Sequence, residues 1–503
     1  MRAQLAHLAP LLLCIVGLGA WLYGSRGSLL GGDSHGRSRW ARGGDLQVLA
    51  RERTPGIVLG WLGRRLLRAP AEDNVLAFGV QRSGKTSTLV VPTLVEWRGS
   101  CVATSTKDEL VRLTAGWRGG LGPVHVFAPL DPDLGWAERL GVSAVRWNPV
   151  AEAESGSSAS ELADLFTAPG KESSSAHWYL SAATLLTGLF LLEHRLGGDI
   201  GSVLARLNET PPSGYLGLSV EAGGGIASQI LKGISGTPER EAGSIISTAR
   251  SSLSLWLDER VATATAAQGA GTLLNLDSLL GQGGTLYLVA PAEDAERCRP
   301  LFSALLATLL RRATARARAQ GGVLSPRLLL ALDEVANFAR IPRLDSYVST
   351  GPGQGIQALL CFHDLAQIEA GYGPDRARTI WNNCRARLLL PGQGDLKTLD
   401  HFSRAIGDET IHYLNRHWSD HSSGTTESRN SRPLASPDDL RRSAATTLVY
   451  ASSPPVRLRS KGWDQVERWR RAVASRRPPL EPLALAPAPL PSQPSIQEKP
   501  PCL

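Results

Sequence analysis

Lysine is scarce in this chain: seven residues in 503, although arginine raises the basic total to 54. Cysteine is also scarce, with six residues, and no two of them have the C-x-x-C spacing of a zinc site or a redox dithiol. We therefore expect reduced, mostly buried thiols, as in a protein body that lies in the cytoplasm. Because lysine is rare, a motif that is completed by a lysine is less probable as a chance match in this chain.

Apolar runs long enough to cross a bilayer are scarce as well. Residues 5–23 form the single candidate, with one histidine and no charged residue, and a helix of this length is about what a membrane requires. More arginines follow this run than precede it, which predicts an anchor over residues 1–24 and a single-pass protein of the inner (cytoplasmic) membrane. A cleaved signal peptide is the alternative, because Arg2 precedes the apolar run.

The composition otherwise describes a globular protein. Hydrophobic residues make up 42% of the chain, and its length has room for two or three domains. The net charge of +8 suits a polyanionic partner or an anionic membrane surface, but an arginine-rich solvated surface explains it equally well.

The clearest motif is a phosphate-binding loop of the form G-x-x-x-x-G-K-[ST]. The predicted nucleotide-binding residues are Gly79, Val80, Gln81, Arg82, Ser83, Gly84, Lys85, Thr86 and Ser87. Glycines allow the backbone to turn its N–H groups towards a phosphate, and the start of a following helix favours anions. We expect Lys85 to contact the β- and γ-phosphates of ATP and assist catalysis, and Thr86 to bind Mg²⁺.

The flanking pattern predicts an α/β fold. The motif lies between a short apolar strand at residues 74–78 and a helix that Pro92 must kink or end. Further apolar strands alternate with helices, which is typical of a mostly parallel sheet. They are predicted at residues 100–105, 123–129, 285–290, 328–332, 358–363, 385–390, 446–451 and 456–459.

The chain divides into blocks of different composition. We predict a motor domain in two parts, residues 71–150 and 281–460, interrupted by an all-α insertion at 151–280. A juxtamembrane linker is predicted at residues 25–70, and a Pro-rich tail that is not expected to fold at 461–503. The polar, serine-rich stretch 416–438 is interpreted as a loop.

Two carboxylates end a strand of the predicted motor domain. Asp333 and Glu334 follow the apolar run 328–332, and a parallel strand would deliver them to the carboxyl edge of the sheet. There Asp333 would bind Mg²⁺ and Glu334 would act as the general base, the role of a Walker B motif. A helix that begins with acidic residues is the alternative. His363 ends another strand near the same edge, as a γ-phosphate sensor or as a polar strand end.

Four stretches, in order, resemble the TraG/TraD-like coupling proteins of type IV secretion and conjugation systems. They are Gln81-Arg82-Ser83-Gly84-Lys85 with residues 91–94, the strand–helix junction 104–110, Leu332-Asp333-Glu334, and the helix at 379–384. The resemblance implies an N-terminal membrane anchor, a RecA-like P-loop motor with an inserted all-α domain, and hexamers with ATP between subunits. It also implies delivery of DNA, single-stranded and bound to a relaxase, or of secreted proteins to the components of a secretion channel.

Two positions depart from the family pattern. Many members have an arginine where this chain has Gln354, and glutamine is frequent where it has His363. Both are candidate sensor positions, and the missing arginine leaves the rate of hydrolysis open. Three hypotheses follow: a DNA-transfer ATPase, a nucleotide-binding docking platform that hydrolyses little, and a DNA translocase of the chromosome-partition type.

Overall fold

A single eleven-stranded sheet forms the centre of the protein, with strand order β15-β14-β11-β3-β10-β9-β4-β8-β5-β6-β7. All neighbours from β11 to β7 run parallel, and β14 and β15 are antiparallel at one end. The strands are β3 (Val75–Phe78), β4 (Ser100–Ser105), β5 (Val124–Phe127), β6 (Ser143–Arg146), β7 (Thr272–Leu273), β8 (Thr285–Val289), β9 (Leu328–Leu332), β10 (Ile356–Phe362), β11 (Ala386–Leu389), β14 (Thr446–Tyr450) and β15 (Val456–Leu458). The predicted α/β class with a mostly parallel sheet is confirmed, and β6 and β7 are additions to it.

The computed structural model describes residues 36–50, 56–131, 137, 140–171, 176–419 and 422–475. In these ranges no helix combines the length and the apolar character that crossing a membrane requires. The predicted anchor at residues 1–24 and the tail beyond residue 475 lie outside the described residues.

Helices cover both faces of the sheet, which explains why its central strands β3, β4, β8, β9 and β10 are buried at every position. In β9, Leu329 and Ala331 face one hydrophobic core, and the alternate residues Leu328, Leu330 and Leu332 face the other. The first core contains α2 (Val91–Glu96), α3 (Glu109–Arg118) and α20 (Glu467–Ala474). The second contains α13 (Ala292–Ala319), α14 (Val335–Phe338), α15 (Leu344–Thr350), α16 (Leu365–Tyr372), α17 (Pro374–Asn383), α18 (Leu396–Ile406) and α19 (Pro437–Arg442).

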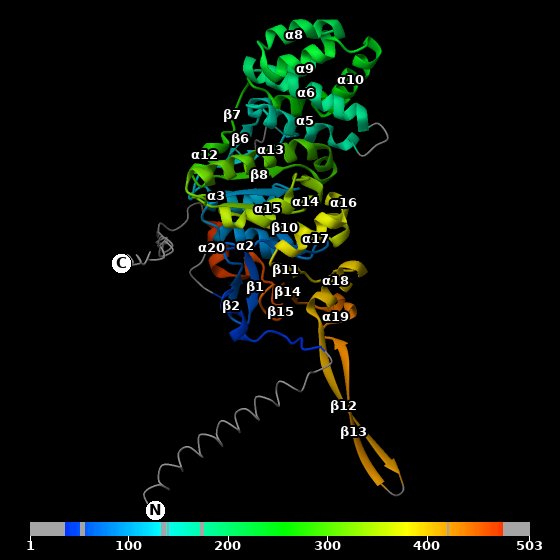
Figure 1. Cartoon of the computed structure of the whole chain (residues 1–503). Coiled ribbons are helices and arrows are strands. Elements are labelled where there is room, and N and C mark those ends of the chain that lie inside the picture. The colour runs from blue at the N-terminus through cyan, green and yellow to red at the C-terminus, as the bar shows by residue number, and fades with distance from the viewer. Residues whose placement is uncertain are drawn as a thin grey trace, which may run out of the picture.

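A block of helices lies between β6 and β7 in the sequence and forms one end of the molecule (Figure 1). Its members are α5 (Gly156–Lys171), α6 (Ala176–Leu196), α7 (Ile200–Glu209), α8 (Tyr215–Glu221), α9 (Gly225–Ser235), α10 (Glu239–Ser252) and α11 (Glu259–Thr265). The ring of Phe166 in α5 packs against Phe190 of α6 and against Trp256 of the 3-10 segment Ser254–Leu257, with centroid distances of 6.0 Å and 5.0 Å. The chain then returns to the sheet through β7 and α12 (Leu276–Gly281).

Two stretches for which the sequence predicted no helix or strand have regular secondary structure. Residues 58–68, within the predicted linker 25–70, form the antiparallel pair β1 (Val58–Leu62) and β2 (Arg65–Arg68). Residues 467–474, within the predicted tail 461–503, form α20. The two elements stabilise each other, because the rings of Trp61 and Trp469 lie edge to face with centroids 6.0 Å apart. This contact joins distant parts of the chain and has no local sequence signal.

The prediction of a loop at residues 416–438 is wrong. Strands β12 (Asp408–Ser419) and β13 (Ser422–Pro433) pair along their whole length as a hairpin. The hairpin projects from the body at the end opposite the helical block (Figure 1). The residues of the hairpin whose burial is described, 408–413 and 428–433, are all at least partly exposed, so they lack the alternation that marks a half-buried strand.

Replacing Phe127 with alanine should lower the free energy of unfolding by about 3–5 kcal/mol. The Phe127 ring is fully buried on β5, with centroid distances of 6.5 Å to Trp147 and 6.2 Å to Phe302 of α13. Urea unfolding followed by tryptophan fluorescence measures the loss, and Phe127→Leu is the control that retains most of the volume. A loss below about 1 kcal/mol for the alanine variant would contradict this packing.

Candidate nucleotide-binding site

The glycine-rich loop connects β3 to a helix at the carboxyl edge of the sheet. Gly84 has a φ of 90°, a left-handed conformation that glycine adopts without strain. Gly79 is needed for a different reason: a Cβ there would lie 2.4 Å from the Ser83 hydroxyl oxygen. Arg82 is also left-handed, with a φ of 62°. These conformations form the tight turn that the motif predicts.

The helix after the loop begins with a π-helical segment. It covers Lys85–Val90 and becomes the α-helix α2 at Val91, directly before Pro92. The helix does not end at Pro92 but continues to Glu96. The change from π- to α-helical geometry comes directly before this proline, which lacks the N–H that an α-helical interior requires.

Lys85 and Thr86 point to different partners. The Lys85 Nζ donates to the carbonyl oxygens of Gly79, at 2.6 Å, and Val80, at 3.1 Å. The side chain is buried in the loop, with 6% of the residue exposed. The Thr86 hydroxyl donates to Asp333 Oδ2 at 2.5 Å, which joins the loop to the end of β9. The two motifs that lie almost 250 residues apart in the sequence thus meet in one place.

Asp333 provides a carboxylate with an unused oxygen. Its Oδ1 is buried and has no hydrogen-bond partner among the described residues. Burial raises the pKa of Asp333, while the Thr86 hydroxyl and the Lys85 ammonium oppose that shift. A buried carboxylate oxygen beside a hydroxyl is the type of oxygen donor set that Mg²⁺ prefers. These residues therefore fit a divalent cation.

Glu334 has a strained backbone, with a left-handed φ of 54° that few residues other than glycine adopt. Its Oε2 accepts a hydrogen bond from Asn337 Nδ2 at 3.3 Å, and its Oε1 lies 3.9 Å from His363 Nε2. The imidazole of His363 and the Asn337 amide lower the pKa of Glu334 against the effect of burial. This shift favours the charged form of the Glu334 carboxylate.

His363 reaches the candidate site and Gln354 does not. The backbone of His363 is held on both sides: its N–H donates to Gln367 Oε1 at 2.8 Å and its carbonyl accepts from Gln393 Nε2 at 2.7 Å. Gln354 precedes β10, whereas His363 follows it, so they lie at opposite edges of the sheet. Gln354 therefore cannot sense a phosphate bound in the loop of its own chain.

Three contributing residues were not predicted as site residues. Asn337 contacts Glu334, Gln393 positions His363, and the Thr104 hydroxyl donates to the Asp333 carbonyl at 2.7 Å. Gln393 and Thr104 act through contacts between separate strands or turns, for which the sequence contains no spacing signal. Asn337 lies only three residues after Glu334, and this local spacing could have indicated the contact.

The arrangement of a glycine-rich loop, a buried lysine and two carboxylates is matched by a known family. The family profile described as "Type IV secretory system Conjugative DNA transfer" matches residues 39–467. The chain belongs to this family. The resemblance to type IV coupling proteins is therefore confirmed, and the match covers the sheet and the helical block alike.

Curated members of this conjugative-transfer family are similar along most of the chain. The conjugal transfer protein TraG of Escherichia coli is 30% identical over 432 residues, which cover 75% of this chain and 65% of TraG. VirD4 of Rhizobium rhizogenes is 24% identical over 462 residues, covering 86% of this chain and 66% of VirD4. The chain thus spans about two thirds of the length of these relatives.

Solved structures share the fold. The bacterial conjugative coupling protein TrwB, without its first 70 residues, has a TM-score of 0.63 at 17% identity, covering 86% of this chain and 95% of that chain. A structure of TrwB in complex with ADP and Mg²⁺ has a TM-score of 0.61 at 17% identity, with coverages of 86% and 95%.

Proposed function

We propose that this protein is a membrane-anchored ATPase that couples ATP hydrolysis to the delivery of DNA, or of DNA–protein complexes, into a type IV secretion channel. The observation that carries the proposal is the contact between Thr86 and Asp333, which joins the phosphate-binding loop to the two carboxylates. ATP and Mg²⁺ are the proposed ligands, and structures of the similarly folded TrwB in complex with an ATP analogue and with ADP and Mg²⁺ support this choice.

Each residue of the site has a proposed task. The loop from Gly79 to Ser87 would hold the phosphates, with Lys85 transferring from the loop carbonyls to the β- and γ-phosphates. Thr86 and Asp333 would hold Mg²⁺, which when bound neutralises charge on the phosphates. Glu334 would accept a proton from the attacking water, and His363 would orient that carboxylate.

The larger organisation is proposed from the family. Helices α5–α11 would be the inserted all-α domain of a RecA-like motor, and residues 1–24 the anchor in the inner membrane. A homo-hexamer would bind ATP between subunits, where an arginine of a neighbouring copy can supply the charge that Gln354 lacks. The substrates would be single-stranded DNA with its relaxase, or secreted proteins, and the partners would be channel components.

The rate of ATP hydrolysis by the purified protein, with and without single-stranded DNA, tests this function. We expect turnover that needs Mg²⁺ and rises with DNA. A second candidate, the docking platform with little hydrolysis, is favoured by Gln354 and by the 3.9 Å separation of His363 from Glu334. Nucleotide binding without turnover, with or without DNA, would favour it. The chromosome-partition alternative has no support in the family match.

Replacing Asp333 with asparagine should raise the Mg²⁺ concentration needed for half-maximal nucleotide binding by about tenfold or more. The change removes the charge of the buried oxygen proposed to contact the cation and leaves the side-chain volume almost unchanged. Titration with a fluorescent ATP analogue at varied Mg²⁺ measures the shift. The control is Asp375→Asn, an exposed aspartate of α17. Equal Mg²⁺ requirements in the two variants would contradict the assignment of Asp333.

A further inference from the structure

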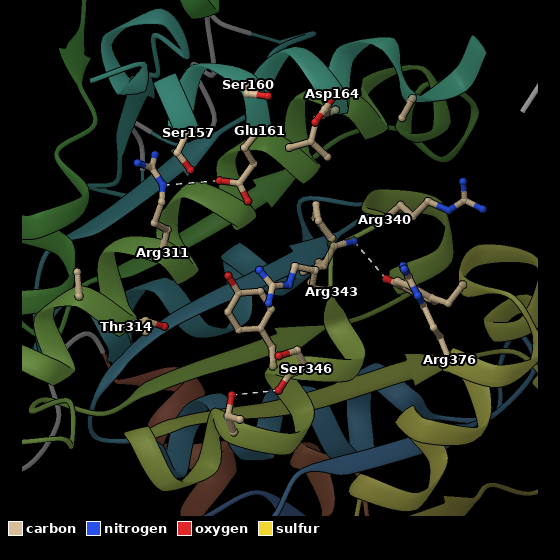
Figure 2. A pocket seen from close by; sticks show the side chains of 18 of the residues that line it. Ser157, Ser160, Glu161, Asp164, Arg311, Thr314, Arg340, Arg343, Ser346 and Arg376 are labelled. Atoms are coloured by element: carbon tan, nitrogen blue, oxygen red, sulfur yellow. Dashed lines mark hydrogen bonds and ion pairs between the residues drawn. The ribbon is translucent and has the colours of Figure 1, made fainter. Parts of the chain in front are cut away.

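A large open cleft lies apart from the phosphate-binding loop, between the helical block and the sheet domain. Its volume is about 1130 Å³. Its walls are α5, α13, the turn at residues 340–343, α15 and the start of α17. Figure 2 shows α5 above the cleft, with side chains of α13 and of the 340–343 turn pointing into it.

The lining is rich in arginine. Five arginines line the cleft, against two carboxylates, those of Glu161 and Asp164. The five are Arg311, Arg318, Arg340, Arg343 and Arg376. Fixed positive charge is therefore in excess in the lining as a whole; the arginines come from α13, the 340–343 turn and α17, and both carboxylates come from α5.

Two of these arginines have partners within the chain. The Nε of Arg311 lies 3.7 Å from Glu161, and Arg340 donates to the backbone carbonyls of Ala370 and Gly371. The other three, Arg318, Arg343 and Arg376, are exposed and have no ion pair among the residues that the structure describes. They come from three separate elements, so their gathering is a property of the fold and not of one charged helix.

An aromatic side chain accompanies the free charges. Tyr347 of α15 is half-buried and lines the cleft one turn after Arg343. Cationic groups that track phosphates, together with an aromatic ring on which a base can stack, are the combination that binds single-stranded nucleic acids. A duplex hides its bases and cannot use the ring in this way.

We propose that this cleft binds single-stranded DNA, with Arg318, Arg343 and Arg376 on its phosphates and Tyr347 against a base. The inference rests on the proposed function in taking DNA as the substrate, and it adds where the strand lies. The cleft differs from the nucleotide site in both position and residues, so the two can be tested separately.

The chain connects this cleft to the catalytic carboxylate by a short segment. Glu334 and Arg343 are nine residues apart, and both have a left-handed backbone, with φ values of 54° and 55°. A smaller cavity of about 500 Å³ shares Arg340 and Tyr372 with the cleft and extends to Asn337, which contacts Glu334. A DNA strand bound by Arg343 would therefore contact the segment 334–343, which sets the conformation of Glu334. Through this segment, we expect DNA to stimulate ATP turnover.

Fluorescence anisotropy of a labelled single-stranded oligonucleotide tests the proposal on the full-length protein. Arg343→Ala/Arg376→Ala should weaken binding by about tenfold at ~0.1 M salt and reduce the slope of log K against log[salt] by about 1.4. The matched control is Arg64→Ala/Arg65→Ala, which removes two exposed arginines of the β1–β2 hairpin outside the cleft. Nucleotide binding should be unchanged in both double variants.

Tyr347 supplies a second, independent readout. Tyr347→Leu should weaken single-strand binding on the order of tenfold and leave duplex binding unchanged, whereas Tyr347→Phe retains the ring and should bind normally. Equal affinities of the cleft and control double variants would overturn the proposal. So would a cleft variant that changes the oligomeric state and not DNA binding, because the occupant would then be a second copy. If the unmodified protein shows no ATPase activity, that result counts against the proposed function and not against the DNA-binding cleft.

Discussion

Alanine in place of Lys85 should reduce ATP turnover on the order of 10²- to 10³-fold, the usual cost of removing a preorganised donor from a transition-state charge. The Lys85 ammonium is held in the loop by the carbonyls of Gly79 and Val80, next to the proposed position of the phosphates. Alanine removes the charge that offsets the phosphate oxygens and leaves the loop glycines intact. Phosphate release at saturating ATP and Mg²⁺ measures the effect.

The comparison that makes this result interpretable is Lys232→Ala, which removes an exposed lysine from α9. That variant should retain normal turnover. Thermal unfolding of Lys85→Ala should begin near the temperature of the unmodified protein, because the loop lies on a sheet whose core is untouched. Normal turnover in Lys85→Ala would remove the phosphate-binding loop from the mechanism.

Glutamine in place of Glu334 should reduce turnover by about 10²- to 10⁴-fold while nucleotide binding persists. A neutral amide cannot accept the proton of the attacking water, but it has nearly the shape of the carboxylate and can still contact Asn337. Lys85 and Thr86, the residues proposed to bind the nucleotide, are unchanged. Single-turnover hydrolysis and equilibrium binding of ATP separate the two effects.

Glu293→Gln is the appropriate comparison, since this exposed glutamate lies in the first turn of α13. It should behave as the unmodified protein in both assays. If Glu334→Gln hydrolyses ATP at the normal rate, the general base is another group. If it loses ATP binding as well, Glu334 has a structural role and not a chemical one.

The strands and the site motifs were predictable from sequence because their signals are local. β9 is apolar throughout and β10 is apolar except for the buried Gln357, since helices cover both faces of the sheet, and each strand is followed by a polar residue at the carboxyl edge. The approach of Asp333 to Thr86 follows from two such strand ends in one parallel sheet.

The missed elements depend on contacts far along the chain. The β1–β2 pair and α20 pack on each other through Trp61 and Trp469, which neither segment reveals alone. In the β12–β13 hairpin, none of the residues whose burial is described (408–413 and 428–433) is buried, so they show no half-buried pattern. Sequence also grouped Gln354 with His363 as sensors, although β10 separates them by its full length. Only the direction of that strand shows that they lie at opposite edges.

The position of β10 between β3 and β9 limits how this protein can move. β10 is hydrogen-bonded to both neighbours, so the loop that follows β3 and the acids that follow β9 are joined by two continuous ladders. Strand spacing then keeps the two strands about 10 Å apart throughout a catalytic cycle. The candidate nucleotide site therefore cannot open or close by moving β3 away from β9. Any motion coupled to hydrolysis must come from the segments that follow the strands at the sheet edge, or from neighbouring copies.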